Sequence, residues 1–181
     1  MMTKFILVRH ANPDYSVLES CDIKALNGNV VFLSEKGIMQ AKNLSKEPIF
    51  NGAEVLICSP YTRTMQTASY ISLSTGLEIT GEFDLHEWVP DVNALSFDTN
   101  EKIVSNYKKA VEDFNYGTVT KDAEYEDMNK VRERALKVLN KYLGYSKVIV
   151  VTHSGVLYSL TKKRFKQAEY MELEYKGETI L

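Results

Sequence analysis

The stretch from Val148 to Gly155, VIVVTHSG, sets four consecutive β-branched residues directly before a Thr-His pair. Branching at Cβ favours extended backbone, so residues 148–151 are predicted to form a buried strand. The apolar run from Lys4 to Val8 predicts a second buried strand, and the charged pair Arg9-His10 follows it. Short strands that are apolar on both faces are typical of a parallel sheet covered by helices on both sides.

The remaining elements alternate along the chain. Further strands are predicted at 55–58, 78–82 and 169–175. Helices are predicted at 34–45, 59–73, 100–115, 125–143 and 155–161, and residues 11–33 are predicted to be mainly loop. In the helix at 100–115, the core-facing side chains are expected to be Ile103, Val104, Tyr107, Val111 and Phe114. This alternation predicts an α/β fold, a three-layer α/β/α sandwich with a mostly parallel central sheet, formed by residues 1–181 as a single domain.

The composition narrows the classes of function. The net charge of -2 argues against a nucleic-acid partner, which usually leaves a basic excess. No apolar run approaches the ~20 residues needed to cross a bilayer, and the first ten residues lack the pattern of a signal peptide. The two cysteines, Cys21 and Cys58, do not suggest a disulfide framework, so a reduced, cytoplasmic protein is expected. The spacing of Cys and His residues predicts no metal site.

Three groups of polar residues follow predicted strands. They are Arg9-His10, the stretch from Ser59 to Arg63, and the stretch from Thr152 to Gly155. In open α/β sheets, ligands bind beyond the carboxyl ends of the strands, so these groups are expected to meet. Arginine forks and a helix N-terminus favour phosphate oxygens, and a neutral imidazole is a nucleophile at pH 7. The pattern therefore predicts a phosphoryl-binding pocket.

The same segments resemble the histidine phosphatase superfamily, which has the phosphoglycerate mutase-like fold. Leu7 to His10 is similar to the opening signature of that family. The likeness continues in family order through Leu33-Ser34-Glu35-Lys36-Gly37, Ser59 to Ala68, Leu85-His86-Glu87, and Val151 to Gly155. Together these segments cover residues 4 to about 160.

The resemblance implies a role for each matching residue. His10 would be the phosphorylated nucleophile, and Arg9, Arg63 and His153 would bind the phosphoryl group. Glu87 would donate a proton to the leaving oxygen and later activate water, which fits a carboxylic acid in a partly desolvated site.

Several neighbouring residues leave alternatives open. Asp84 and Asp91 are substitutes for Glu87 as the acid, and His86 is interpreted as structural because adjacent side chains of an extended segment point apart. Ala11 stands where the family commonly has glycine, and the sequence from Asn12 to Tyr15 departs from the family pattern. Asn12, Ser59 and Ser154 are further candidates for binding the substrate phosphate.

The resemblance favours a phosphatase that hydrolyses phosphomonoesters without a metal or other cofactor. About 65 residues separate Glu87 from His153, whereas mutases of the family usually carry longer insertions. The expected partner is a small phosphorylated metabolite, and a phosphoprotein is the alternative for an open pocket. The competing hypotheses are a phosphomutase, a non-catalytic module that binds a phosphorylated ligand, and a metal-dependent hydrolase. An acidic to neutral pH optimum is expected, because Glu87 must begin protonated.

Overall fold

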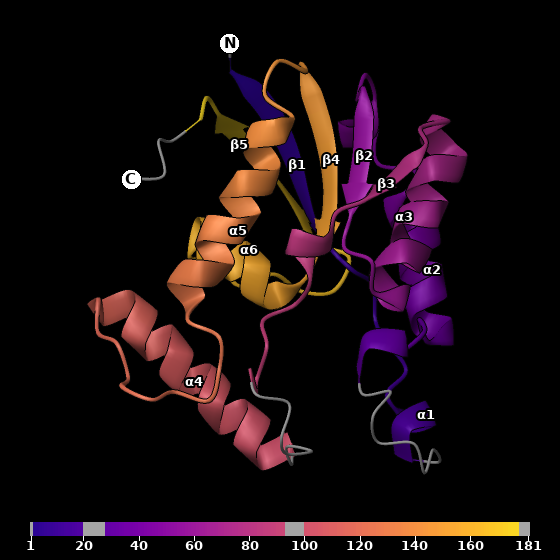
Figure 1. Ribbon diagram of the computed structural model, residues 1–181. Coiled ribbons are helices and arrows are strands. Elements are labelled where there is room, and N and C mark those ends of the chain that lie inside the picture. Colours follow the sequence, from indigo (N-terminus) through magenta and orange to yellow (C-terminus); the bar gives the residue numbers. More distant parts are fainter. Residues whose placement is uncertain (1, 20–27, 93–99, 178–181) are drawn as a thin grey trace.

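The computed structural model describes residues 2–19, 28–92 and 100–177, and within these ranges a five-stranded sheet forms its centre. The strand order is β3-β2-β4-β1-β5 (Figure 1). The strands are β1 (Thr3–Arg9), β2 (Val55–Cys58), β3 (Ile79–Gly81), β4 (Lys147–Thr152) and β5 (Tyr170–Tyr175). The pairs β3–β2, β2–β4 and β4–β1 are parallel, and β5 runs antiparallel to β1. The prediction of a mostly parallel sheet is confirmed.

Helices cover both faces of this sheet. They are α1 (Ser16–Glu19), α2 (Glu35–Leu44), α3 (Thr62–Thr75), α4 (Asn100–Tyr116), α5 (Met128–Lys141) and α6 (Ser154–Thr161). Short 3-10 turns occur at Pro48–Phe50, at Phe83–Leu85 and at residues 28–30. Helices α2 and α3 lie on one side, and α5 and α6 lie on the other, with α4 beyond α5 (Figure 1). The predicted α/β/α layering is confirmed.

Two apolar cores, one on each face, result from the alternation of side chains along the strands. Leu7 and Val150 face the cluster that contains the inner side of α5, whereas Ile6 and Ile149 face the cluster with α2 and α3. All four side chains are fully buried. Burying an aliphatic side chain of this size contributes about 1.5–3 kcal/mol. The two central strands β1 and β4 therefore carry apolar residues on both faces, as a covered parallel sheet requires.

Several details of the predicted helices differ from the structure. Helix α5 begins at Met128 instead of residue 125, because the Asp127 carboxylate caps it by accepting from the N–H of Asn129 (2.8 Å). It ends at Lys141. Helix α3 begins at Thr62, after Pro60. The prediction that Val104 faces the core is wrong, because its side chain is 52% exposed and α4 packs through a narrower face.

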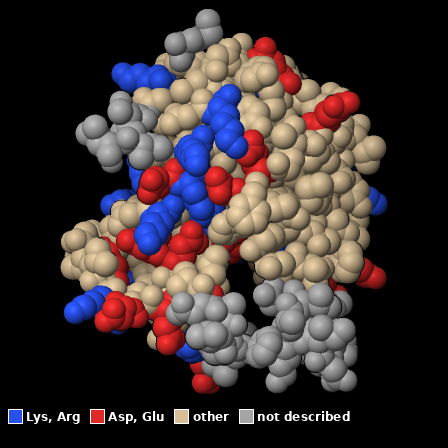
Figure 2. Space-filling view, in the orientation of Figure 1, with Lys and Arg blue, Asp and Glu red and all other residues tan. Residues whose placement is uncertain are grey.

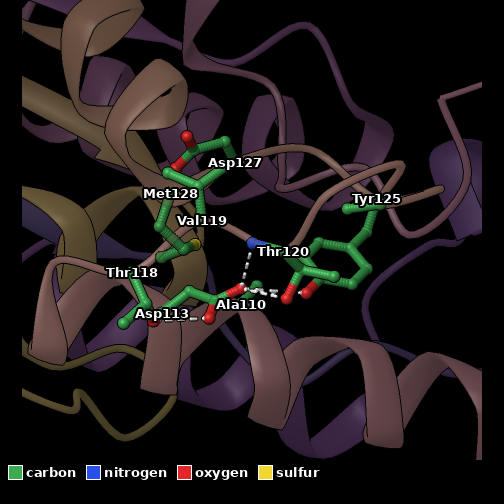
Figure 3. Close-up of a pocket in the computed structure, with 9 residues that line it drawn as sticks. Ala110, Asp113, Thr118, Val119, Thr120, Tyr125, Asp127 and Met128 are labelled. Atoms are coloured by element: carbon green, nitrogen blue, oxygen red, sulfur yellow. Dashed lines mark hydrogen bonds between the residues drawn. The ribbon is translucent and has the colours of Figure 1, made fainter.

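The connection from α4 to α5 folds around the carboxylate of Asp113. This carboxylate accepts from the hydroxyls of Thr118 (2.7 Å), Thr120 (2.7 Å) and Tyr125 (3.1 Å). Figure 3 shows these side chains around a cavity of about 20 Å³, room for about one water molecule. Hydrogen bonds among these four residues hold the α4–α5 connection in place, and none of the four belongs to the predicted phosphoryl pocket.

The surface carries charges of both signs. In Figure 2, the band of blue and red atoms over α5 mixes Lys and Arg with Asp and Glu. No helix in the described ranges has the length and apolar character needed to cross a bilayer.

Cys58 is a buried free thiol at the end of β2, and burial raises its pKa to about 12. Cys21 lies outside the described residues.

Candidate active site

The register of the parallel strands brings the predicted site residues to one edge of the sheet. Arg9 of β1 lies opposite Thr152 of β4, so His10 and His153 are the next residues of two adjacent strands. Their ring centroids are 5.2 Å apart. Ser59 follows β2 on the other side of β4, and its N–H donates to a β4 carbonyl (3.0 Å). The expected meeting of the three strand ends is therefore present.

Arg63, in the first turn of α3, connects the two imidazoles. Its Nε–H donates to Nε2 of His10 (3.2 Å), and an Nη2–H donates to Nδ1 of His153 (3.1 Å). Nη1 donates to the carbonyl of Gly28. The guanidinium carbon lies 5.1 Å from the centre of the Tyr61 ring, and the Arg63 side chain is buried. A single planar group therefore orients both rings.

These contacts determine which nitrogen of each ring holds the proton. Arginine offers only donors, so Nε2 of His10 and Nδ1 of His153 must accept. The protonated Nδ1 of His10 then donates to the carbonyl of Ala11 (2.8 Å), and Nε2–H of His153 donates to the Ser59 hydroxyl (2.8 Å). His10 consequently presents an Nε2 lone pair to the space that Arg63 borders.

Both histidines are held in the neutral form. Burial lowers the pKa of His10 to about 3, with a further contribution from Arg63 and a smaller one from Arg9. Burial also lowers the pKa of His153 well below its usual value, again with help from Arg63. At pH 7 the imidazole of His10 is therefore unprotonated at Nε2, as a nucleophile must be.

The side chain of Arg9 is only partly hydrogen-bonded within the described residues. One of its terminal nitrogens, Nη1, donates to the carbonyl of Phe165 (2.6 Å). Its Nε is buried and has no hydrogen-bond partner among the residues that the structure describes. A buried charged donor without a partner costs free energy, and an anion would remove that cost.

Glu87 lies on the same edge of the sheet, in the connection between β3 and α4. Its Oε1 accepts from the N–H groups of Trp88 and Gly155, both at 2.9 Å. Burial raises the pKa of the Glu87 carboxyl, while these N–H groups and the Arg63 charge offset part of the rise. A carboxyl with a raised pKa can carry a proton at a higher pH than an exposed one.

Gly155 explains how α6 comes so close to Glu87. A Cβ atom at this position would lie 2.6 Å from Oε1 of Glu87 and 2.9 Å from Cβ of Trp88. Next to Glu87, the Nδ1–H of His86 donates to the Glu87 carbonyl (2.8 Å), and the His86 ring packs against Phe83 at 5.2 Å. Within the described chain, no cluster of three or more potential metal ligands is present.

All three further candidates for substrate binding have contacts within the protein. The Asn12 amide donates to the carbonyl of Pro13 (3.1 Å) and to the Ser34 hydroxyl (2.9 Å). Ser154 forms a side-chain hydrogen bond with Tyr107. The third, Ser59, accepts from His153 as described above.

The structure also places near Glu87 two residues that the sequence did not single out as site residues. Arg134 of α5 donates to three carbonyls in the segment that carries Glu87, and it pairs with Glu126 (2.8 Å). Tyr107 of α4 lies close enough to Glu87 for that carboxylate to help raise its pKa, although burial is the larger cause. Both Arg134 and Tyr107 occupy amphipathic helices, where periodicity predicts burial or exposure and gives no sign of a distant partner.

Comparison with known proteins identifies relatives. The family model for the histidine phosphatase superfamily (branch 1) matches residues 5–175. The adenosylcobalamin/alpha-ribazole phosphatase of Escherichia coli K12 is 24% identical over 136 residues, 69% of this chain and 63% of that protein. The chain therefore matches slightly less than two thirds of the length of this relative.

Solved structures share the fold. A mycobacterial glucosyl-3-phosphoglycerate phosphatase superposes with a TM-score of 0.74 at 17% identity, covering 96% of this chain and 91% of the other. The alpha-ribazole phosphatase of Shigella flexneri gives a TM-score of 0.65 at 18% identity, covering 94% and 89% of the two chains. The family match extends over nearly all of the sheet and helices described above, and we conclude that the chain belongs to the histidine phosphatase superfamily, branch 1.

Proposed function

We propose that this chain is a phosphatase that hydrolyses phosphomonoesters through a phosphohistidine formed on His10. One observation carries the proposal: a neutral imidazole with its Nε2 lone pair directed at Arg63, beside a buried Arg9 donor without a partner. A phosphoryl group bound there would satisfy Arg9 and draw Arg63 onto its oxygens. The named phosphatases among the relatives support this class of reaction.

In the first step, Nε2 of His10 attacks phosphorus, and the bond between phosphorus and the ester oxygen breaks. The imidazole becomes positively charged, and its Nδ1–H bond to the Ala11 carbonyl stabilises that charge. Arg9 and Arg63 bind the phosphoryl oxygens during transfer. Glu87 gives its proton to the leaving oxygen, so the product departs as an alcohol.

In the second step, the Glu87 carboxylate accepts a proton from a water molecule, and the resulting oxygen attacks the phosphohistidine. The bond between phosphorus and Nε2 breaks, its electron pair returns to nitrogen, and inorganic phosphate leaves. His10 is again neutral and Glu87 again protonated, so the cycle closes. No step requires a metal ion or a redox partner.

The proposed substrates are small phosphorylated metabolites, and the proposed place of action is the cytoplasm. The charged and polar groups of the site would surround one phosphoryl group, and the Tyr61 ring lies against Arg63 and His153 at its border. These groups would bind the phosphoryl group of a phosphomonoester, and the surrounding side chains would contact the alcohol part of the substrate.

The proposal is tested by hydrolysis of para-nitrophenyl phosphate in EDTA by the native chain, His10→Ala and Glu87→Gln. We expect turnover in the native chain and a loss of roughly 100-fold or more in both variants. In Glu87→Gln the loss comes from the second step, because no carboxylate activates water, so its intact mass should gain one phosphoryl group when the reaction is stopped without acid. With an alkyl ester such as β-glycerophosphate, whose leaving oxygen needs a proton, kcat/KM of the native chain should fall as the pH rises through the raised pKa of Glu87.

The control for the mass measurement is the double variant His86→Gln/Glu87→Gln, which should still take up a phosphoryl group because the His86 ring packs against Phe83. Turnover that survives in His10→Ala would eliminate His10 as the nucleophile. Movement of the phosphoryl group between two hydroxyls of a phosphorylated substrate, with no release of phosphate, would instead identify a mutase.

A further inference from the structure

The segment that carries Glu87 is clamped by one arginine of the neighbouring helix. We call residues 84–89 the acid-bearing segment. Arg134 of α5 donates through Nη1 to the carbonyls of Asp84 (2.6 Å) and His86 (2.8 Å), and through Nη2 to the carbonyl of Glu87 (3.4 Å). Three backbone positions around the acid are thus attached to a single side chain.

The same guanidinium is itself fixed by Glu126. Nε donates to Oε1 of Glu126 (2.8 Å) and Nη2 donates to Oε2 (3.0 Å), a two-point contact between side chains that are each only 12% exposed. Each of the five N–H groups of Arg134 therefore has an acceptor. A buried, two-point ion pair has little freedom to rotate, so the direction of the remaining donors is set.

Glu126 also holds the far end of the acid-bearing segment. Its Oε2 accepts from the N–H of Val89 (3.2 Å), and its carbonyl accepts from Nε1–H of Trp88 (2.7 Å). The N–H of Glu126 in turn donates to the carbonyl of Val89 (2.9 Å). Arg134 and Glu126 together fix the backbone on both sides of Glu87.

This clamp matters because the Glu87 carboxylate has few other supports. Among the described residues, the donors to this carboxylate are two backbone N–H groups, and both bind Oε1. One of these belongs to Trp88, inside the acid-bearing segment, so a shift of that backbone would move the carboxylate and its own anchor together. A proton donor displaced by about 1 Å can lose roughly 100-fold in rate.

We infer that Arg134 is a positioning residue for proton transfer, and that it acts by holding the backbone of Glu87, with Glu126 as its partner. The inference rests on the proposed function and adds to it a specific effect on the leaving group. An alkyl phosphate needs a proton on its leaving oxygen, whereas para-nitrophenolate is stable without one. Loss of the clamp should therefore slow alkyl phosphates far more than para-nitrophenyl phosphate.

The experiment compares kcat/KM for β-glycerophosphate and para-nitrophenyl phosphate in the native chain, Arg134→Lys and Glu126→Gln. Lysine keeps the charge but cannot reach three carbonyls and two carboxylate oxygens in one plane. We expect kcat/KM for the alkyl ester to fall roughly 10- to 100-fold, and that for the aryl ester to fall by less than about 3-fold. Inhibition by inorganic phosphate should be unchanged, because Arg9 and Arg63 are untouched.

Lys141→Met is the matched control. It removes a different ion pair of α5, the one between Lys141 and Glu82 (2.7 Å). Glu82 precedes the acid-bearing segment in the sequence and is not part of it. Neither substrate should be affected. Melting curves check folding, and Glu126→Gln carries the test if Arg134→Lys fails to fold.

Equal losses on the two esters, or no loss on either, would overturn the inference, since a merely stabilising pair would reduce the active fraction without regard to the leaving group. Failure of the native chain to hydrolyse either ester would refute the proposed function itself. That outcome is separate from a failure confined to the variants.

Discussion

At the scale of single residues, the site depends on imidazoles that are buried without charge. A histidine whose pKa is lowered by folding contributes its full stability above its unfolded pKa of 6.5, and this contribution is lost as the pH falls. For His10, with a folded pKa of about 3, the loss between pH 7 and pH 5 is about 2 kcal/mol. His153 shifts in the same direction.

We predict that His10→Gln makes the free energy of unfolding depend less on pH. Urea unfolding of the native chain and of the variant, at pH 7 and pH 5 without phosphate, should show that the variant loses about 2 kcal/mol less than the native chain. Parallel losses in the two proteins would mean that His10 is not kept neutral by the fold.

The sequence was enough to name these residues, but it could not predict which ring nitrogen of each histidine carries the proton. His10, His153 and Arg63 follow apolar strands or begin a helix, and the geometry of a parallel sheet then brings them together. Which nitrogen is protonated depends on Arg63 reaching both rings and on the carbonyl of Ala11. Such contacts depend on side-chain rotamers and loop paths, which no periodicity in the sequence encodes.

At the scale of elements, the N-terminus of α6 and the acid-bearing segment are in direct contact through Gly155. We predict that Gly155→Ala lowers activity on alkyl phosphates at least as much as on aryl phosphates and destabilises the fold by about 1–3 kcal/mol, because the new methyl group would meet Glu87 and Trp88. Kinetics and thermal unfolding measure the two effects.

Gly81→Ala provides the comparison for this substitution. A Cβ at Gly81, in β3, would have no heavy atom within 4 Å, so its activity and melting temperature should remain close to native. If Gly155→Ala also behaved as native, the close approach of α6 to Glu87 would not be a requirement of the site.

Elements with strong periodicity were the most predictable. The strands at 4–8 and 148–151 and the core face of α5 are confirmed, because short continuous apolar runs and helical spacing directly report burial. The role of Arg134 was missed for the same reason. On α5 it falls on the polar face of the helix, and its buried ion pair with Glu126 depends on a connection that packs over that face.

At the scale of the whole molecule, the buried donor of Arg9 should couple ligand binding to stability. Phosphate that binds only the folded chain stabilises it by about 2.7 kcal/mol at 100 times its Kd. For a chain of this size, this corresponds to a rise in melting temperature of about 5–10 °C. Scanning calorimetry with phosphate, compared with sodium chloride at the same ionic strength, measures the shift.

Arg9→Met is the informative variant for this measurement. It removes the Nε donor, which has no partner in the described part of the chain, so the shift with phosphate should shrink while the shift with chloride stays the same. An equal shift in the two proteins would place the bound anion elsewhere on the molecule.

The triple contact of Arg63 also has a consequence for how the protein opens. One guanidinium joins Gly28, His10 and His153, which come from three distant parts of the chain. None of these contacts can be kept if Arg63 swings away, so the pocket should come apart as one cooperative unit. In hydrogen exchange, the N–H groups of His10 and Ser59, which bond to adjacent carbonyls of β4, would then report a single opening event.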